Sequence, residues 1–162
     1  FFLLHSSTMN RFFPIFYILL TGCIPTSETF TPPPSEKVVV TYVVDGDTIE
    51  VEFGNGETER VRIIGIDAKE KDECYFEEAT AYLKEAIEGE YVSMTRNKRE
   101  NRDKYERLLR YVRSTDGDIG LSMLTLGYAK NYPWFRHDRE QEYTQAELLA
   151  KASQMGLWGG CE

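Results

Sequence analysis

The fold is decided by the stretch VVVTYVVDGDTIEVEF, residues 38–53. Its first seven residues are rich in β-branched side chains, and its last five alternate apolar with acidic residues, as the two faces of a half-buried strand require. Between these two parts, Asp45-Gly46-Asp47 has the composition of a turn. The stretch therefore predicts two strands joined by a tight connection.

The same kind of pattern continues toward the C-terminus. Gly54-Asn55-Gly56 predicts a hairpin turn that leads into a third strand. Apolar residues at helical spacing predict a helix that ends at Gly89. The further elements that we expect are the third strand at 59–66, the helix at 76–87, strands at 91–96 and 108–113, and helices at 119–126 and 139–154. Five strands and three helices favour an α+β fold, mainly a small closed β barrel, over an alternating parallel sheet.

The N-terminal residues have the layout of a targeting segment. From Met9, which we take as the natural start, one positive residue, Arg11, precedes an apolar run at 12–20. This run is shorter than the roughly 20 residues that span a bilayer, so a signal peptide over residues 1–22 is favoured over a transmembrane helix. Ordinary secretion and an unprocessed helix stay open as alternatives to the lipid anchor described next.

The end of this segment, Leu20-Thr21-Gly22-Cys23, resembles a bacterial lipobox, which implies cleavage before Cys23 and a lipid on its sulfur. Residues 23–36 contain three consecutive prolines and predict a stiff polar tether. We therefore expect an exported lipoprotein, held at the extracytoplasmic side of a membrane, with one folded domain over residues 37–162. The apolar content of the chain suffices for one such domain and not for two.

Two further cysteines, Cys74 and Cys161, lie within the expected domain. Neither has a His or another Cys nearby at zinc-site spacing, so a zinc site is disfavoured. Export would place both thiols in an oxidising compartment, where a pair is usually bridged. We expect a Cys74–Cys161 disulfide, and two unrelated thiols are the alternative.

The net charge of −8 argues against attraction of a polyanion by the whole surface. Locally the balance differs, because eight basic residues lie between Arg96 and Arg113 against three acidic ones. Three carboxylates near strand ends, Asp47, Asp67 and Glu70, can converge at a barrel mouth, and carboxylate and carbonyl oxygens suit a hard cation such as calcium. A local basic patch with a bridging cation is the expected way for this acidic chain to bind nucleic acid.

Three segments together resemble the signature of the staphylococcal nuclease family. They are Asp45-Gly46-Asp47-Thr48, then Arg62-Ile63-Ile64-Gly65-Ile66-Asp67-Ala68-Lys69-Glu70, then Asp103-Lys104-Tyr105-Glu106-Arg107. The resemblance runs from about Val38 to Trp158, and it implies a five-stranded OB-fold-like barrel with three α-helices. It also implies a monomeric calcium-dependent endonuclease that acts on DNA or RNA and leaves 3′-phosphate products.

The resemblance assigns roles to matching positions. Calcium is expected on the carboxylates of Asp47 and Asp67 and on the Ala68 carbonyl. Glu70 is expected as the general base on the attacking water, and Arg62 and Arg107 as the groups that hold the phosphate. Lys104 and Tyr105 are expected to contact substrate. A non-catalytic OB-fold nucleic-acid-binding lipoprotein and a structural calcium-binding lipoprotein stay open as alternatives.

The chain departs from the family pattern at two places. Ala68-Lys69 replaces the usual Thr-Pro, and loss of the proline is expected to free the loop that carries Glu70. Glu106 stands where a glycine is common, which places a negative charge beside Arg107. Both departures are expected to lower activity.

Overall fold

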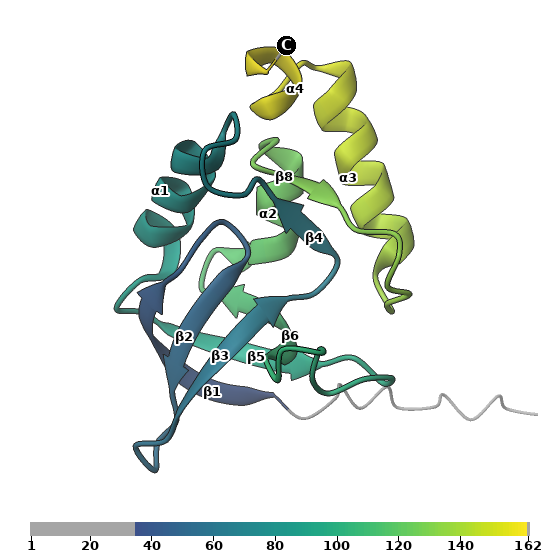
Figure 1. Ribbon diagram of the computed structural model, residues 1–162. Helices are drawn as coiled ribbons and strands as arrows, with labels where there is room; N and C mark the ends of the chain where they lie inside the picture. The colour runs from purple at the N-terminus through teal and green to yellow at the C-terminus, as the bar shows by residue number, and fades with distance from the viewer. Residues whose placement is uncertain (1–34, 162) are drawn as a thin grey trace, which may run out of the picture. The chain divides into compact units, whose positions relative to one another are not determined.

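The computed structural model describes residues 35–161, which belong to one compact unit, Pro32–Glu162. Its first three strands form an antiparallel meander, as the sequence predicted (Figure 1). These strands are β1 (Glu36–Val43), β2 (Thr48–Glu52) and β3 (Thr58–Ile63). The register pairs Ile49 with Val43 on one side and with Val61 on the other, so apolar side chains share the inner face.

Two later strands close the sheet into a barrel. β5 (Tyr91–Arg96) pairs with β1, and β6 (Leu108–Ser114) pairs with β5. The barrel closes because β6 also runs parallel to β3, with Arg62 opposite Leu109. Side chains from all five strands fill the interior, among them Val40, Ile49, Val61, Met94 and Val112, each fully buried. The predicted five-stranded OB-fold-like barrel is confirmed.

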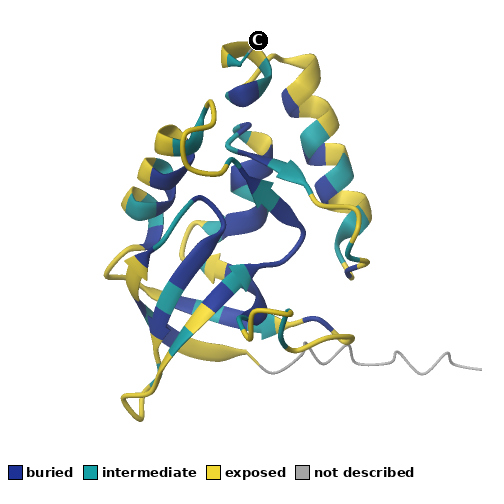
Figure 2. Ribbon diagram, viewed as in Figure 1, coloured by how far each residue is buried: buried dark blue, intermediate teal, exposed yellow. Residues whose placement is uncertain are grey.

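Helices cover part of this barrel (Figure 1). Within residues 35–161 the helices are α1 (Phe76–Ile87), α2 (Ile119–Thr125), α3 (Glu140–Ala152) and a single turn, α4 (Leu157–Gly160). α1 packs against β1, while α2 packs against β6 and α3. Their buried faces turn toward the core and their exposed faces outward (Figure 2). The three predicted helices are confirmed, and α4 is an addition.

The predicted third strand, 59–66, is wrong at its C-terminal end. β3 ends at Ile63, and the chain turns at Gly65, whose φ of +79° is a conformation that favours glycine. A Cβ at Gly65 would also lie 2.6 Å from a ring atom of His137. After this turn a separate strand, β4 (Ile66–Ala68), pairs with β8 (Ala129–Asn131) in a two-stranded sheet. This break carries Asp67 and Ala68 out of the barrel sheet.

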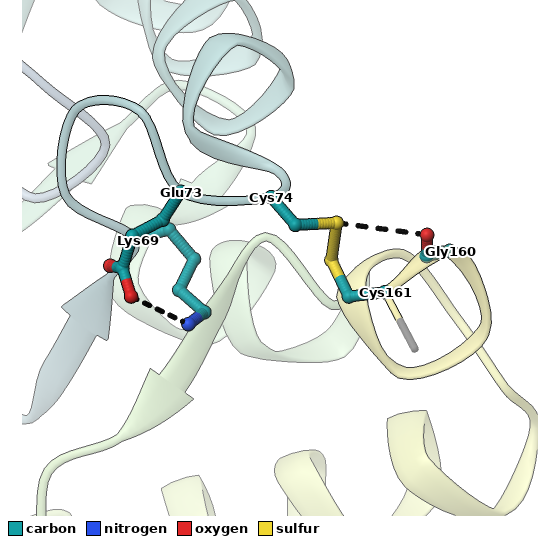
Figure 3. Close-up of a disulfide and its surroundings, with 5 residues drawn as sticks. All are labelled: Lys69, Glu73, Cys74, Gly160 and Cys161. Carbon is teal, nitrogen blue, oxygen red and sulfur yellow. Dashed lines mark hydrogen bonds and ion pairs between the residues drawn. A yellow bond between two sulfur atoms is a disulfide. The ribbon is translucent and has the colours of Figure 1, made fainter.

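The expected disulfide is confirmed, because Cys74 and Cys161 are bonded through their sulfurs (Figure 3). A two-residue strand, β7 (Gly117–Asp118), follows β6. The expected signal peptide, Cys23 and most of the tether lie outside the described residues. No helix in the part of the chain that the structure describes is both long and apolar enough to cross a membrane.

Candidate active site

Asp47 is held at the turn between β1 and β2 with both carboxylate oxygens engaged. The Thr48 hydroxyl donates to Oδ1 at 3.0 Å, and the Ala68 N–H donates to Oδ2 at 2.8 Å. Gly46 permits this approach, because a Cβ there would lie 2.7 Å from the Cβ of Ala68. The turn is thus packed onto β4, and Asp47 is buried where the two meet.

Arg62 lies between Asp47 and Asp67 and forms an ion pair with each. Its Nη1 lies 2.9 Å from Oδ2 of Asp47, and its Nη2 lies 3.1 Å from Oδ1 of Asp67. Nη1 also donates to the Ile66 carbonyl at 2.8 Å. The Arg62 side chain is 14% exposed and that of Asp67 is 49% exposed, so the pair extends from the interior to the surface. Of the three carboxylates that we expected to converge, Asp47 and Asp67 both contact Arg62, whereas Glu70 is joined to none of these residues by a hydrogen bond or ion pair.

Burial makes the charge of Asp47 costly. It raises the pKa of this carboxyl to about 7, although the Arg62 guanidinium and the Ala68 N–H act in the opposite direction. A cation that binds beside Asp47 would therefore stabilise the charged form of a desolvated carboxylate.

The second arginine reaches the same aspartate from the segment before β6. Nε of Arg107 lies 2.7 Å from Oδ2 of Asp103, and its Nη1 donates to the Thr48 hydroxyl at 3.2 Å. The same hydroxyl donates to Asp47, so a chain of hydrogen bonds joins Arg107 to Asp47 through Thr48. Arg62 and Arg107, which are 45 positions apart, are thereby directed at one carboxylate.

Asp103 shapes the segment that carries Arg107. Its Oδ1 accepts the N–H groups of Tyr105 and Arg107, at 2.9 and 3.0 Å. The Tyr105 ring is 67% exposed and lies near two cations, with Nζ of Lys104 4.8 Å and Cζ of Arg107 5.4 Å from its centroid. Glu106 has a φ of +63°, which explains why glycine suits this position. Its side chain is exposed and its carbonyl accepts a hydrogen bond from Arg102.

Glu70 lies apart from this network. It is exposed on the loop between β4 and α1, and no hydrogen bond or ion pair within residues 35–161 joins its carboxylate to the aspartates or arginines above. Its backbone is fixed instead by Glu73, whose Oε2 accepts the Glu70 N–H at 2.7 Å.

Sequence reasoning missed three residues of this arrangement, namely Thr48, Asp103 and Glu73. Thr48 and Asp103 stand inside the quoted segments but had been given no role. The four-residue spacing of Asp103 and Arg107, with turn-forming Asp first, was the signal that could have paired them. Glu73 offered only its place in an acidic stretch.

The donor set at this site fits a hard cation. Asp47 and Asp67 supply carboxylate oxygens, and Oδ2 of the half-exposed Asp67 makes no hydrogen bond to a described residue. No group of three or more His, Cys, Asp or Glu arranged as metal ligands occurs in residues 35–161. A cation here would therefore need ligands beyond side chains, such as a backbone carbonyl and water.

Some basic residues of the segment 96–113 bind other residues of the fold, and others are exposed at the surface. Arg102 pairs with Glu59 and Arg107 with Asp103, while Arg110 is buried and donates to Asn101. Arg96, Lys98, Arg99 and Lys104 are exposed, and none of them forms an ion pair with another described residue. The Asn97 side chain donates to the Arg136 carbonyl, which ties this segment to the loop that carries Trp134, 86% exposed.

Comparison with known proteins agrees with this geometry. A family model described as "Staphylococcal nuclease homologue" matches residues 60–160. A thermonuclease of Staphylococcus intermedius is 31% identical over 148 residues, which cover 86% of each chain. An uncharacterized endonuclease of Haemophilus influenzae is 31% identical over 143 residues, 87% of this chain and 78% of the relative. One from Escherichia coli O157:H7 is 33% identical over 124 residues, 76% of this chain and 77% of the relative. The chain belongs to the staphylococcal nuclease family.

Proposed function

We propose that this chain is a calcium-dependent endonuclease that hydrolyses DNA or RNA by attack of water on phosphorus and leaves 3′-phosphate products. The single observation that carries the proposal is that Arg62, from β3, contacts Asp47 directly, and Arg107, from the segment before β6, is linked to Asp47 through the Thr48 hydroxyl. A phosphodiester resists attack because it is anionic, so two guanidiniums at one point suit its neutralisation.

The two arginines keep capacity for substrate. A guanidinium carries five N–H donors. Nε and Nη1 of Arg107 are engaged by Asp103 and Thr48, while its Nη2 makes no hydrogen bond to a described residue. Both Nη atoms of Arg62 are engaged, by Asp47, Ile66 and Asp67, while its Nε makes no hydrogen bond to a described residue. We assign both residues to binding the phosphate and to stabilising the charge that develops on its oxygens.

Asp47, Asp67 and the Ala68 carbonyl are proposed to hold the calcium ion. When bound, the ion would supply positive charge to the phosphate and lower the pKa of a bound water. Glu70 is proposed to accept the proton of the attacking water, for which an exposed carboxylate is suited. Lys104 and Tyr105 are proposed to contact the substrate chain, with the exposed Tyr105 ring as a surface on which a base stacks.

The test is hydrolysis of plasmid DNA and of an RNA oligomer by the purified chain, with calcium and with excess chelator. We expect cleavage in calcium alone, 3′-phosphate ends, and at least a tenfold loss in Glu70→Gln. Glu78→Gln is the matched control, because Glu78 is an exposed glutamate in the first turn of α1. Binding of the oligomer without cleavage under any of these conditions would establish the non-catalytic binder instead.

Export with a lipid anchor at Cys23 is also proposed, with the domain acting outside the cytoplasm as a monomer. The Cys74–Cys161 disulfide supports export, because such bonds persist in oxidising compartments. We expect Cys23→Ala to release the processed protein from the membrane fraction. A variant that stays with membranes after signal cleavage would contradict the anchor.

A further inference from the structure

We infer that Glu73 and the Cys74–Cys161 disulfide together position Glu70, so that the activity of this chain depends on the cross-link. The inference rests on the proposed function, since it assigns a positioning role around the proposed general base. It concerns the loop from Lys69 to Tyr75, called here the Glu70 loop, which joins β4 to α1.

The Glu70 loop adopts a conformation that must be held from outside. Asp72 has a φ of +72° and Tyr75 a φ of +74°, both in the left-handed region that non-glycine residues rarely adopt. Each such conformation is strained and persists only where the surroundings impose it. Lys69 stands where the family pattern has a proline, so this chain lacks that local constraint.

Glu73 supplies one constraint by folding back onto the start of the loop. Its Oε2 accepts the Glu70 N–H at 2.7 Å, and its own N–H donates to the Glu70 carbonyl at 2.9 Å. Its Oε1 lies 3.1 Å from Nζ of Lys69 (Figure 3). The hydrogen bond from Glu70 and the contact with Lys69 lower the pKa of Glu73 and keep it ionised. The backbone of Glu70 is thus bound to Glu73 on both sides.

These contacts are exposed, so they would not hold the loop alone. The Glu73 side chain is 46% exposed, and an ion pair at such a site stabilises a structure only weakly. A stronger constraint acts on the next residue, because Cys74 is covalently joined to Cys161. Figure 3 shows Glu73 and the disulfide as consecutive parts of one loop.

The far end of the cross-link is itself anchored. Leu157 in α4 is buried, and its N–H donates to the Gly127 carbonyl at 2.9 Å. Gly160 packs against the Tyr75 ring, since a Cβ there would lie 2.7 Å from Cε2. Gly127 leads into β8, which pairs with β4. The Glu70 loop is therefore fixed at both ends to the same β4–β8 sheet, once through the chain and once through sulfur.

The experiment compares the full chain with Cys74→Ser/Cys161→Ser and with Glu73→Gln, using Glu77→Gln as the control for loss of one exposed glutamate charge. At saturating calcium we expect kcat to fall at least fivefold without the disulfide and at least threefold in Glu73→Gln. KM should change less than twofold, because the phosphate-binding arginines are untouched. Hydrogen exchange at residues 69–75 should quicken in both variants, and Glu77→Gln should match the wild type.

Reduction of the wild type by a dithiol such as dithiothreitol should give the same loss of kcat. One S–S bond is broken, two thiols form, and the dithiol becomes a cyclic disulfide as two electrons and two protons pass to the cysteines. Reoxidation should restore activity, and the double-serine variant should not respond to the dithiol.

Thermal unfolding checks that each variant is folded. Glu73→Gln keeps the cross-link, so this variant still tests the loop if the double-serine variant does not fold. Unchanged exchange at residues 69–75 in both the reduced protein and Glu73→Gln would overturn the inference. If exchange at residues 69–75 is faster in the reduced protein and in Glu73→Gln, but the wild type never cleaves nucleic acid, the positioning of the loop stands and only the proposed function is refuted.

Discussion

The chain contains the triplet Asp-Gly-Asp twice, at 45–47 and at 116–118, and the two copies have different fates. In both, the second aspartate is buried and pairs with an arginine, Asp47 with Arg62 and Asp118 with Arg139. Residue type, burial and partner are therefore alike. What differs is the surroundings of each pair.

Asp118 serves the packing of helices. Its Oδ1 accepts the Leu121 N–H at 2.7 Å, which caps α2, and the Tyr143 hydroxyl at 2.7 Å, while Oδ2 pairs with Arg139. Helix and hydroxyl together satisfy this carboxylate inside the α2–α3 contact. Its glycine is unconstrained by neighbours, because nothing lies within 4 Å of a Cβ at Gly117.

Asp47 instead belongs to a network of charged and polar side chains that extends to the surface. Its partner Arg62 also pairs with the half-exposed Asp67, and its partner Thr48 also accepts a hydrogen bond from Arg107. Its glycine is packed against Ala68 and Ala79. A buried aspartate and arginine pair is thus a structural element at one site and, in the proposed function, part of a polyanion-binding site at the other, and the residues that contact each pair make the difference.

The largest effect is expected when the arginine of the Asp47–Arg62 pair is removed. Arg62→Ala should lower kcat/KM at least about 100-fold, because it deletes a donor that stabilises charge at phosphorus. Arg60→Ala, on the same strand and paired only with the exposed Glu50, is the control and should stay within twofold. Rates on plasmid DNA at saturating calcium check this, and a loss below tenfold in Arg62→Ala would contradict its role.

A substitution in the Asp118–Arg139 pair should lower stability and leave activity nearly unchanged. Asp118→Asn keeps a capping oxygen but removes the charge that pairs with Arg139, so we expect about 2 kcal/mol less free energy of unfolding in urea. The kcat of the folded protein should change less than threefold. A loss of activity comparable to that in Arg62→Ala, with stability unchanged, would remove the distinction between the two copies.

The glycines provide a smaller contrast. Gly46→Ala would press a methyl against the Cβ atoms of Ala68 and Ala79 and should destabilise the protein by about 2 kcal/mol, with reduced activity because the turn moves away from β4. Gly117→Ala meets no neighbour but has a φ of +135°, so about 1 kcal/mol of backbone strain and normal activity are expected. Urea unfolding and initial rates for both variants measure the difference.

The smallest effect concerns His137, which lies between the two regions. Its ring contacts Gly65 beside β4, and its Nδ1 lies 3.2 Å from the Tyr111 hydroxyl. Burial lowers the pKa of His137, so the folded state disfavours the imidazolium that the unfolded chain forms near pH 6.5. The contribution of the neutral His137 to stability should be complete above pH 6.5 and be lost as the pH drops below it.

His137→Gln tests this by the difference in slope. The free energy of unfolding should fall less between pH 7.5 and 5.5 in the variant than in the wild type. Equal falls in the two proteins would show that His137 titrates alike in both states.

The sequence by itself determined the barrel and most of its elements, because alternation in VVVTYVVDGDTIEVEF and helical spacing at 76–87 are local consequences of which face is buried. It also indicated the disulfide and the meeting of Asp47, Asp67 and Arg62, but it added to that group the carboxylate of Glu70, which no hydrogen bond or ion pair joins to them. It did not determine the break at Gly65, since the apolar run at 63–66 looks like a continued strand, while the need for glycine at the turn comes from close contact with the distant His137 and Tyr143.

The sequence resemblance had already selected the first Asp-Gly-Asp, but only the tertiary structure decided which residues contact Asp47 and Asp118, and how the Glu70 loop is held. Asp47, Asp118 and Cys74 of the Glu70 loop have partners far away in the chain, and pairing over such distances depends on barrel closure and helix packing. Periodicity reports burial, which is a property of one segment. The environment of a charge is a property of several segments at once, so local pattern cannot contain it.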